Sequence, residues 1–378
     1  MASDDSGRTI LPVSGKMNGV APRLCLPFAT VLVVLCGGAA TPLPGAAQVP
    51  VVTQAPQPAQ AGQPTVQPPF DEWVATLRTD ALARGISRKT VDEALVTVTR
   101  LPVVVERDRT QAELVMTLDT YMKRRLTPRV VRDAKAAAGN QKTVLRKVAT
   151  AYGVPGSVLV AIWGLESNFG RFTGSRPVIS ALATLSYDTR RATYFREEIF
   201  SALRILDSGD VTLPTLSGSW AGAMGQPQFM PSSYLTWAVD FDDDHRRDIW
   251  TSTPDVLASI ANYLKAHGWV EGQRWGREVK IPAAAAERVS TAVPLRMTGG
   301  CSAVRDMTEP RPLGEWTSLG VRQKSGAALP ASDMPASLVR VDTHTFLVYA
   351  NYEALLGYNC AHTYALSVAM LADRIGER

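Results

Sequence analysis

The chain has 378 residues, 46% of them hydrophobic and 20% charged, with a formal net charge of +5 at pH 7. This composition is typical of a globular protein and excludes disorder as its main state, and the length suits one large domain or two modest ones. The positive charge is spread along the chain without a basic block, so the sequence does not indicate a nucleic acid partner.

Residues 1–47 predict a cleavable export signal. A short apolar stretch from Leu24 to Leu35 follows two basic residues and precedes several alanines, which is the order found in secretory signals. It is shorter than the roughly 20 residues that a membrane-spanning helix needs. A lipid anchor at Cys36 is disfavoured, because the bulky Leu35 precedes that cysteine.

The remaining chain predicts a mainly helical α+β fold. Residues 48–69 are rich in Pro and Gln and carry no charge, which indicates an extended linker. From Phe70 to about residue 269, apolar residues recur at helical spacing. Between about 277 and 349 the sequence is richer in Gly, Pro, Thr and Val, and SLVRVDTHTFLVYA is typical of strands. A helix is expected after this strand-rich stretch.

Several common kinds of catalytic site lack their sequence marks. The four histidines form neither a HExxH pair nor a cluster with cysteines, which argues against a zinc hydrolase. The chain has no GxSxG and no GxxxxGK motif. Serine hydrolase and nucleotide chemistry are therefore not indicated.

The stretch VLVAIWGLESNFGRFTG, residues 158–174, places one carboxylate, Glu166, near the end of an apolar helix. The helix is apolar nearly all round, as in a helix buried inside a domain. Burial disfavours the charged form of a carboxyl group, so Glu166 would have a raised pKa and could serve as a general acid. The alternative is an outward-pointing glutamate at a helix end that Gly170 terminates, and the local pattern alone favours this alternative.

Residues 217–234, SGSWAGAMGQPQFMPSSY, predict an irregular loop suited to a sugar ligand. Gln226 and Gln228 offer hydrogen-bond donors and acceptors, Trp220 and Phe229 offer flat faces, and glycines would let a ligand approach the backbone. Sugar rings need this combination, because they expose both C–H faces and hydroxyl groups. A plain connecting loop with its aromatic residues in the core is the alternative.

Five motifs in the same order, from about Phe70 to the C-terminus, resemble the lytic murein transglycosylase B family. They are AIWGLESNFGRFTG, ALATLSYDTRRATYFREE, GSWAGAMGQPQFMPSSYLTWAVDFDDD, IANYLKAHGW and YNCAHTYALSVAMLADRI. The resemblance weakens in the strand-rich stretch. It implies N-terminal helices, a lysozyme-like helical core, a strand-rich insertion and a C-terminal helix that returns to the core, with the bounds 70–150, 151–276, 277–349 and 350–378.

The resemblance implies a periplasmic enzyme that cleaves the β-1,4 bond between N-acetylmuramic acid and N-acetylglucosamine in peptidoglycan strands. It would do so without hydrolysis, leave a 1,6-anhydro sugar and require no cofactor. Glu166 would act as the single catalytic acid and base. The positions that match substrate-binding residues of the family are Ser219, Gln228, Tyr263, Tyr358, Asn359, Tyr364, Arg190 and Arg191. We expect a monomer whose partners are glycan strands and proteins of cell-wall synthesis or remodelling.

A single catalytic carboxylate is chemically sufficient if the N-acetyl group of the substrate assists, as in some glycosidases. Two other functions stay open. One is a hydrolytic muramidase of the same fold, with a second acid such as Asp188 activating water. The other is a non-catalytic peptidoglycan-binding protein. Without the resemblance, Tyr263 and Tyr364 would be core residues and the two arginines a solvated helix face.

The run DFDDDHRRD resembles an EF-hand loop in part. Asp240, Asp242 and Asp244 stand at loop positions 1, 3 and 5, and Asp248 at position 9. The glycine and the final glutamate of that loop are missing. Relatives of the family carry a metal in this loop, which implies a structural Ca²⁺, with Asp255 completing its ligands. An acidic surface turn is the alternative.

Two of the four cysteines lie in the predicted signal, so Cys301 and Cys360 would remain in the exported chain. A pair of cysteines in an oxidising compartment can close one disulfide. We hypothesise this disulfide, with two free thiols as the alternative.

Overall fold

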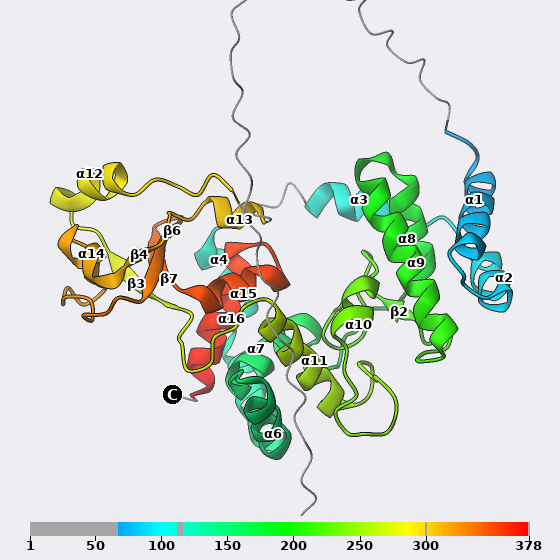
Figure 1. The fold of residues 1–378 in the computed structure, drawn as a ribbon, viewed down its shortest axis with the longest axis horizontal. Coiled ribbons are helices and arrows are strands. Elements are labelled where there is room, and N and C mark those ends of the chain that lie inside the picture. Colours follow the sequence, from blue (N-terminus) through cyan, green and yellow to red (C-terminus); the bar gives the residue numbers. More distant parts are fainter. Residues whose placement is uncertain (1–66, 112–115, 299–300, 377–378) are drawn as a thin grey trace, which may run out of the picture. The chain divides into compact units, whose positions relative to one another are not determined.

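The computed structural model describes residues 67–111, 116–298 and 301–376. The predicted signal and most of the predicted linker therefore lie outside the described residues. The N-terminal helices are α1 (Phe70–Ala83), α2 (Arg88–Val96), α3 (Pro102–Gln111), α4 (Leu118–Arg125), α5 (Pro128–Asn140) and α6 (Lys142–Tyr152) (Figure 1).

The middle of the chain is also helical. Its helices are α7 (Gly156–Ser167), α8 (Val178–Tyr187), α9 (Ala192–Ser208), α10 (Pro231–Trp237) and α11 (Thr253–Ala266), with a 3₁₀ turn, η1 (Thr189–Arg191). Two short strands, β1 (Arg176–Pro177) and β2 (Ser217–Gly218), pair antiparallel. The predicted mainly helical fold with a small sheet is confirmed.

Helix α7 lies at the centre of the helical core. All of its residues except Gly164 and Glu166 are buried, and it contacts α5, α6, α11 and α16. Each fully buried Leu, Ile or Val side chain contributes about 1.5–3 kcal/mol to folding, so the apolar sequence of this helix fixes it in the core. Within the described ranges, no single helix is long and apolar enough to cross a bilayer, although the bent pair α6–α7 meets that criterion together.

The end of α7 differs from the expectation that Gly170 terminates it. The helix stops at Ser167, and Asn168, Phe169 and Gly170 all adopt positive φ angles of 50°, 59° and 80°. Asparagine tolerates the left-handed conformation better than most residues, so it starts the turn. A Cβ atom on Gly170 would lie 2.4 Å from Oε1 of Gln226, so glycine is needed there for space as well as for its φ angle.

The strand-rich insertion holds a second, smaller core. Its elements are β3 (Gly276–Lys280), α12 (Ala283–Ala292), α13 (Ser302–Arg305), β4 (Arg311–Pro312), α14 (Leu313–Ser318), β5 (Arg322–Gln323), β6 (Pro335–Val341) and β7 (His344–Val348). The five strands form one antiparallel sheet in the order β4-β6-β7-β3-β5. Successive residues of β6 face opposite sides, so Val339 packs on the main helical core while Leu338 packs on the second one.

The C-terminal segment contains two helices where one was expected, α15 (Ala350–Tyr358) and α16 (His362–Ile375). Asn359 and Ala361 both have extended backbone conformations, which interrupts the helical hydrogen bonds. Cys360 lies in this break and forms a disulfide with Cys301 across a Cα–Cα distance of 5.8 Å. The structure thus contains the hypothesised disulfide. It closes a sequence separation of 59 residues, worth about 4 kcal/mol in the chain-entropy account.

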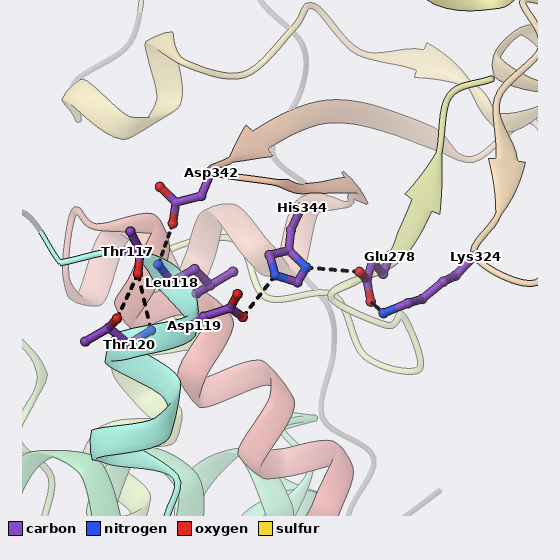
Figure 2. Close-up of polar contacts among 8 residues, drawn as sticks. All are labelled: Thr117, Leu118, Asp119, Thr120, Glu278, Lys324, Asp342 and His344. Carbon is purple, nitrogen blue, oxygen red and sulfur yellow. Dashed lines mark hydrogen bonds and ion pairs between the residues drawn. The ribbon is translucent and has the colours of Figure 1, made fainter. Parts of the chain in front are cut away.

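A polar cluster joins the start of α4 to the sheet (Figure 2). The backbone N–H of Leu118 donates to the carboxylate of Asp342 at 2.5 Å. His344 lies between two carboxylates, 3.1 Å from Asp119 and 3.1 Å from Glu278, and Lys324 pairs with Glu278 at 2.6 Å. Charged groups thus link the insertion to the N-terminal helices.

The pH dependence of this cluster follows from its pKa shifts. The hydrogen bond to Glu278, supported by Asp119, raises the pKa of His344. Burial alone would raise the pKa of Glu278, but Lys324 and His344 lower it. A raised histidine pKa stabilises the fold fully below its unfolded value of about 6.5, and the effect is lost as the pH rises through the folded pKa. The lowered Glu278 pKa adds stability that is lost only in acid.

His344→Asn should therefore lower the free energy of unfolding by up to about 1 kcal/mol at pH 5.5, and by much less at pH 9. Chemical denaturation of wild type and variant at both pH values measures the difference. Arg340→Asn, a substitution at an exposed position of β6, serves as a control that should show no such pH dependence. An equal loss for His344→Asn at both pH values would contradict a charge-dependent link.

Candidate active site

Glu166 lies in the last turn of α7 and lines two cavities. We call the first the arginine cavity; its volume is about 340 Å³, and its lining includes Arg124, Arg125, Arg129, Glu166 and Phe172. We call the second the loop cavity; its volume is about 420 Å³, and its lining includes Glu166, Arg191, Ser219, Gln228, Tyr358 and Asn359. Glu166 is half-buried between them, which places its carboxyl group where two parts of one ligand could meet.

The environment of Glu166 suits proton transfer. Burial raises its pKa from 4.5 to about 7, although a hydrogen bond from Tyr364 and the charge of Arg125 partly oppose this. The Tyr364 hydroxyl donates to Oε1 of Glu166 at 2.5 Å. A carboxyl group with this pKa populates both protonation states near neutral pH, so it can first donate and later accept a proton.

Two tyrosines beside Glu166 stay protonated. Burial, followed by the charge of Glu166, raises the pKa of Tyr364 and of Tyr358 well above 10. Tyr364 uses its proton to hold Glu166, and Tyr358 donates to the backbone oxygen of Pro227 at 2.7 Å. Tyr358 thereby ties the C-terminal segment to the glycine-rich loop, and both tyrosines act as hydrogen-bond donors throughout the neutral range.

The glycine-rich loop presents polar groups to the loop cavity. Oγ of Ser219 accepts hydrogen bonds from the backbone N–H groups of Ala221 and Ala223, at 3.3 and 3.1 Å. Its hydroxyl proton therefore remains the part that a ligand oxygen can accept. Gln228 donates through Nε2 to the backbone oxygens of Thr173 and Gly225, at 3.1 and 2.8 Å, which leaves its side-chain oxygen as an acceptor.

Gln226 was expected from the sequence to offer polar groups to a ligand. It is instead buried, and both of its polar side-chain atoms bond within the protein. Its Oε1 accepts from Nε1 of Trp163 at 2.7 Å, and its Nε2 donates to the backbone oxygen of Trp250 at 2.7 Å. The side chain is only 7% exposed. It fastens the loop to α7 one turn before Glu166, so it fixes the distance between the loop and the carboxyl group.

The structure brings many of the sequence-predicted residues together and places others behind the surface. Six of the predicted residues line the loop cavity: Glu166, Arg191, Ser219, Gln228, Tyr358 and Asn359. Tyr364 does not line it but donates a hydrogen bond to Glu166. Phe229 and Tyr263 are only 2% and 8% exposed, their rings lie 5.5 Å apart, and the Tyr263 hydroxyl donates to the oxygen of Gly357 at 2.7 Å. Phe229 and Tyr263 therefore support the wall of the cavity and do not present their faces to it.

The paired arginines are held by a residue that the sequence did not indicate. Arg190 and Arg191 both form ion pairs with Asp108, which lies in α3 and is 7% exposed. Arg191 lines the loop cavity and Arg190 does not. Asp108 thus compensates much of their charge, and no local pattern around it signals this role.

Asp188, the acid considered for a hydrolytic mechanism, lies away from Glu166. It forms an ion pair with Arg109 at 3.0 Å and lines neither of the two cavities that contain Glu166. Asp133, which does line the arginine cavity, pairs with Arg171 at 3.1 Å. Among the described residues that line these two cavities, Glu166 is thus the one carboxylic acid free for proton transfer.

The acidic loop gathers three of its five predicted ligands. One carboxylate oxygen from each of Asp240, Asp242 and Asp244 lies within 4.8 Å of the others. Asp248 instead accepts from the backbone N–H groups of Trp250 and Thr251. Asp255 is fully buried and accepts from those of Phe241 and Asp248. Asp248 and Asp255 therefore shape the loop. The other three also accept hydrogen bonds within it, and their grouped oxygens form a set of donors that suits a hard cation.

Similarity to known proteins identifies the family of the chain. The model of the transglycosylase SLT domain family matches residues 69–373. The chain belongs to this family. The membrane-bound lytic murein transglycosylase B of Escherichia coli (strain K12) is 34% identical over 262 residues, which cover 68% of this chain and 66% of that protein. The match thus spans slightly less than two thirds of that relative.

Solved structures of family members have the same fold. SltB3 from Pseudomonas aeruginosa, in complex with NAG-anhNAM-pentapeptide, is 42% identical with a TM-score of 0.73, covering 80% of this chain and 78% of its own. The lytic transglycosylase Slt35 of E. coli, in complex with calcium, is 28% identical with a TM-score of 0.66, covering 81% and 92%. The lysozyme-like fold that the resemblance implied is thereby confirmed.

Tyr364→Phe should raise the pKa of Glu166 further, because the lost hydrogen bond favours the charged carboxylate. A hydrogen bond to a charged group is worth about 1.5–3 kcal/mol, so we expect a rise of about one pH unit or more. An NMR titration with carboxyl-labelled glutamate measures this pKa directly. Tyr352→Phe, which removes another buried hydroxyl, is the matched control; an unchanged or lower pKa in Tyr364→Phe would contradict the assignment.

Proposed function

We propose that this chain is a lytic transglycosylase that cleaves the β-1,4 bond between N-acetylmuramic acid and N-acetylglucosamine in peptidoglycan without hydrolysis. The observation that carries the proposal is Glu166, a carboxyl group with a pKa of about 7 between two cavities. Among the described residues that line these two cavities, no second carboxylic acid is free for proton transfer. This supports a mechanism in which Glu166 acts as both the acid and the base. The relative SltB3 was solved with a NAG-anhNAM-pentapeptide, which further supports this class of product.

The proposed reaction has two proton transfers through one residue. Protonated Glu166 donates its proton to the glycosidic oxygen, and the bond from that oxygen to C1 of the muramic sugar breaks. The acetamido group of the same sugar stabilises the positive charge at C1. The O6 hydroxyl then attacks C1, and its proton returns to Glu166. No water is consumed, and the new end is a 1,6-anhydro sugar.

The loop cavity supplies the polar groups that this reaction needs. The Ser219 hydroxyl can donate and the Gln228 oxygen can accept, and both lie on the wall of the cavity that contains Glu166. Tyr364 holds Glu166 in one orientation, which favours transfer in both directions along the same path. Buried tyrosine hydroxyls with raised pKa values do not compete for the proton.

We further propose that the chain works in the periplasm, after removal of residues 1–47, on glycan strands and as a monomer. The relative in E. coli is named as a membrane-bound enzyme of murein, which supports a location in the cell envelope. The reaction needs no cofactor. Proteins of cell-wall synthesis or remodelling are the proposed partners.

Glu166→Gln should lower turnover by at least about a thousandfold, because general acid–base catalysis contributes up to about 10⁴ and both transfers use this group. Glycan binding should change little, since glutamine keeps the shape. Mass spectrometry of the products from purified peptidoglycan measures anhydro ends, which are lighter by one water. Glu287→Gln, an exposed residue outside both cavities, is the control. Hydrated ends from the wild type would instead identify a muramidase.

For the acidic loop we propose a structural Ca²⁺ held by Asp240, Asp242 and Asp244. The three oxygen donors lie close together, and the relative Slt35 was solved with calcium, which supports the proposal. The ion would hold together a loop that otherwise carries mutually repelling carboxylates.

Calcium at 10 mM should raise the melting temperature of the wild type, because a ligand present at 100 times its Kd stabilises the fold by about 2.7 kcal/mol. The double variant Asp240→Asn/Asp244→Asn should show no such rise. Scanning calorimetry with calcium, with magnesium and with a chelator makes the measurement, and Asp306→Asn controls for loss of surface charge. Equal melting temperatures with and without calcium would contradict the site.

A further inference from the structure

The arginine cavity carries positive charge that the protein compensates only in part. Arg124 and Arg125 end α4, Arg129 lies in the first turn of α5, and all three are exposed. Across the described residues, neither Arg124 nor Arg125 forms an ion pair. Arg124 contacts the sulfur of Met116 at 3.3 Å, and Arg125 donates to the backbone oxygen of Leu165 at 2.7 Å.

The carboxylates in the same cavity leave this charge largely unbalanced. Asp133 lies 3.9 Å from Arg129 but is shared with Arg171, which is closer at 3.1 Å. Glu166 is partly protonated near neutral pH. On the other side of Glu166 the balance is different, because Asp108 pairs with Arg191, which lines the loop cavity, and with the adjacent Arg190. The cations beside Glu166 whose charge is least compensated are therefore those of α4 and α5.

An exposed aromatic ring lies in the same cavity. Phe172 is 71% exposed, and its backbone N–H donates to the oxygen of Ser167 at 2.9 Å, which holds the ring beside the end of α7. An exposed phenylalanine next to cations and a catalytic acid offers a flat face for the C–H groups of a sugar or peptide. The cavity thus combines a neutral apolar contact with sites for an anion.

The helix that carries two of these arginines is fixed at both ends. At its start, Leu118 bonds to Asp342 in the turn between β6 and β7, and Asp119 bonds to His344 of β7 (Figure 2). At its end, Arg125 bonds to the last turn of α7. The position of Arg124 relative to Glu166 is therefore set by contacts to two separate parts of the fold, as a binding group requires.

We propose that the arginine cavity binds a carboxylate carried by a muramic acid residue of the strand, and that Arg124 and Arg129 select strands that carry such a carboxylate. This inference rests on the proposed function. The two sugars alternate along a strand, so a muramic residue stands within two sugars of the cleaved bond on either side. Its lactyl group ends in a free carboxylate or continues into a stem peptide that bears carboxylates. N-acetylglucosamine carries no charge.

Three preparations of the same glycan strands separate the sources of the carboxylate. The first keeps its stem peptides, the second has had them removed by an amidase and bears free lactyl carboxylates, and the third bears lactyl groups converted to neutral amides. Release of anhydro ends from each preparation gives kcat and KM. The wild type should have its highest KM on the neutral strands, and higher ionic strength should raise KM on the charged strands only.

The test variant is Arg124→Gln/Arg129→Gln, which leaves Arg125 in place because that side chain holds α7. Its KM should rise about tenfold or more on charged strands, as expected for lost hydrogen bonds to a charged group, and stay unchanged on neutral ones. The matched control is Lys123→Gln/Arg132→Gln, which removes the same charge from exposed positions of the same two helices outside the lining. Phe172→Ala should raise KM equally on all three preparations.

The outcomes distinguish the possibilities. A rise on both charged preparations supports the shared carboxylate, and a rise only on peptide-bearing strands assigns it to the stem peptide. An unchanged KM on every preparation, or an equal rise on neutral strands, would overturn the proposal while anhydro ends from the wild type leave the proposed function intact. If the wild type releases no anhydro ends from any strand, the proposed function itself fails.

Discussion

The hydrogen bond between Tyr364 and Glu166 is the contact on which the site depends. It joins α16 to α7 across 198 residues of sequence. It lies at the last turn of α7, where this otherwise buried helix reaches the two cavities. Burial raises the pKa of the glutamate, and the tyrosine limits that rise while fixing the orientation of the carboxyl group. Without the burial, Glu166 would have the low pKa of an exposed carboxyl group. Without the hydrogen bond, the carboxyl group would not be held in one orientation.

The rest of the fold holds α7, α16 and the segments around them in position. The disulfide pins the break between α15 and α16 to the insertion, and this break carries Asn359 into the loop cavity. The sheet packs one face on the helical core and bonds to the start of α4. The insertion therefore serves the site from a distance, because it braces a segment on each side of Glu166.

Sequence reasoning found the features that local pattern encodes. The apolar run predicted a buried α7, and the cysteine count allowed the disulfide. The local pattern alone favoured an outward-pointing Glu166, and only the family resemblance made the buried acid with a raised pKa the preferred interpretation. Sequence reasoning could not distinguish residues that line the cavity from residues buried behind its wall. Phe229 and Tyr263 belong to the second kind, and only the packing shows that they are covered. The pairing of Asp108 with two arginines depends on helix packing across 82 and 83 residues, for which no spacing rule exists.

The two sides of Glu166 differ in charge. This difference couples the binding of a charged strand to the protonation of Glu166. On the loop side, Ser219 and Gln228 present neutral groups and the charge of Arg191 is compensated. On the other side, the charge of Arg125 lowers the pKa of Glu166. An anion bound to the arginine cavity would offset that charge and so favour the protonated form of Glu166. A strand that brings a carboxylate would therefore help to protonate the acid that cleaves it, whereas a neutral strand would not.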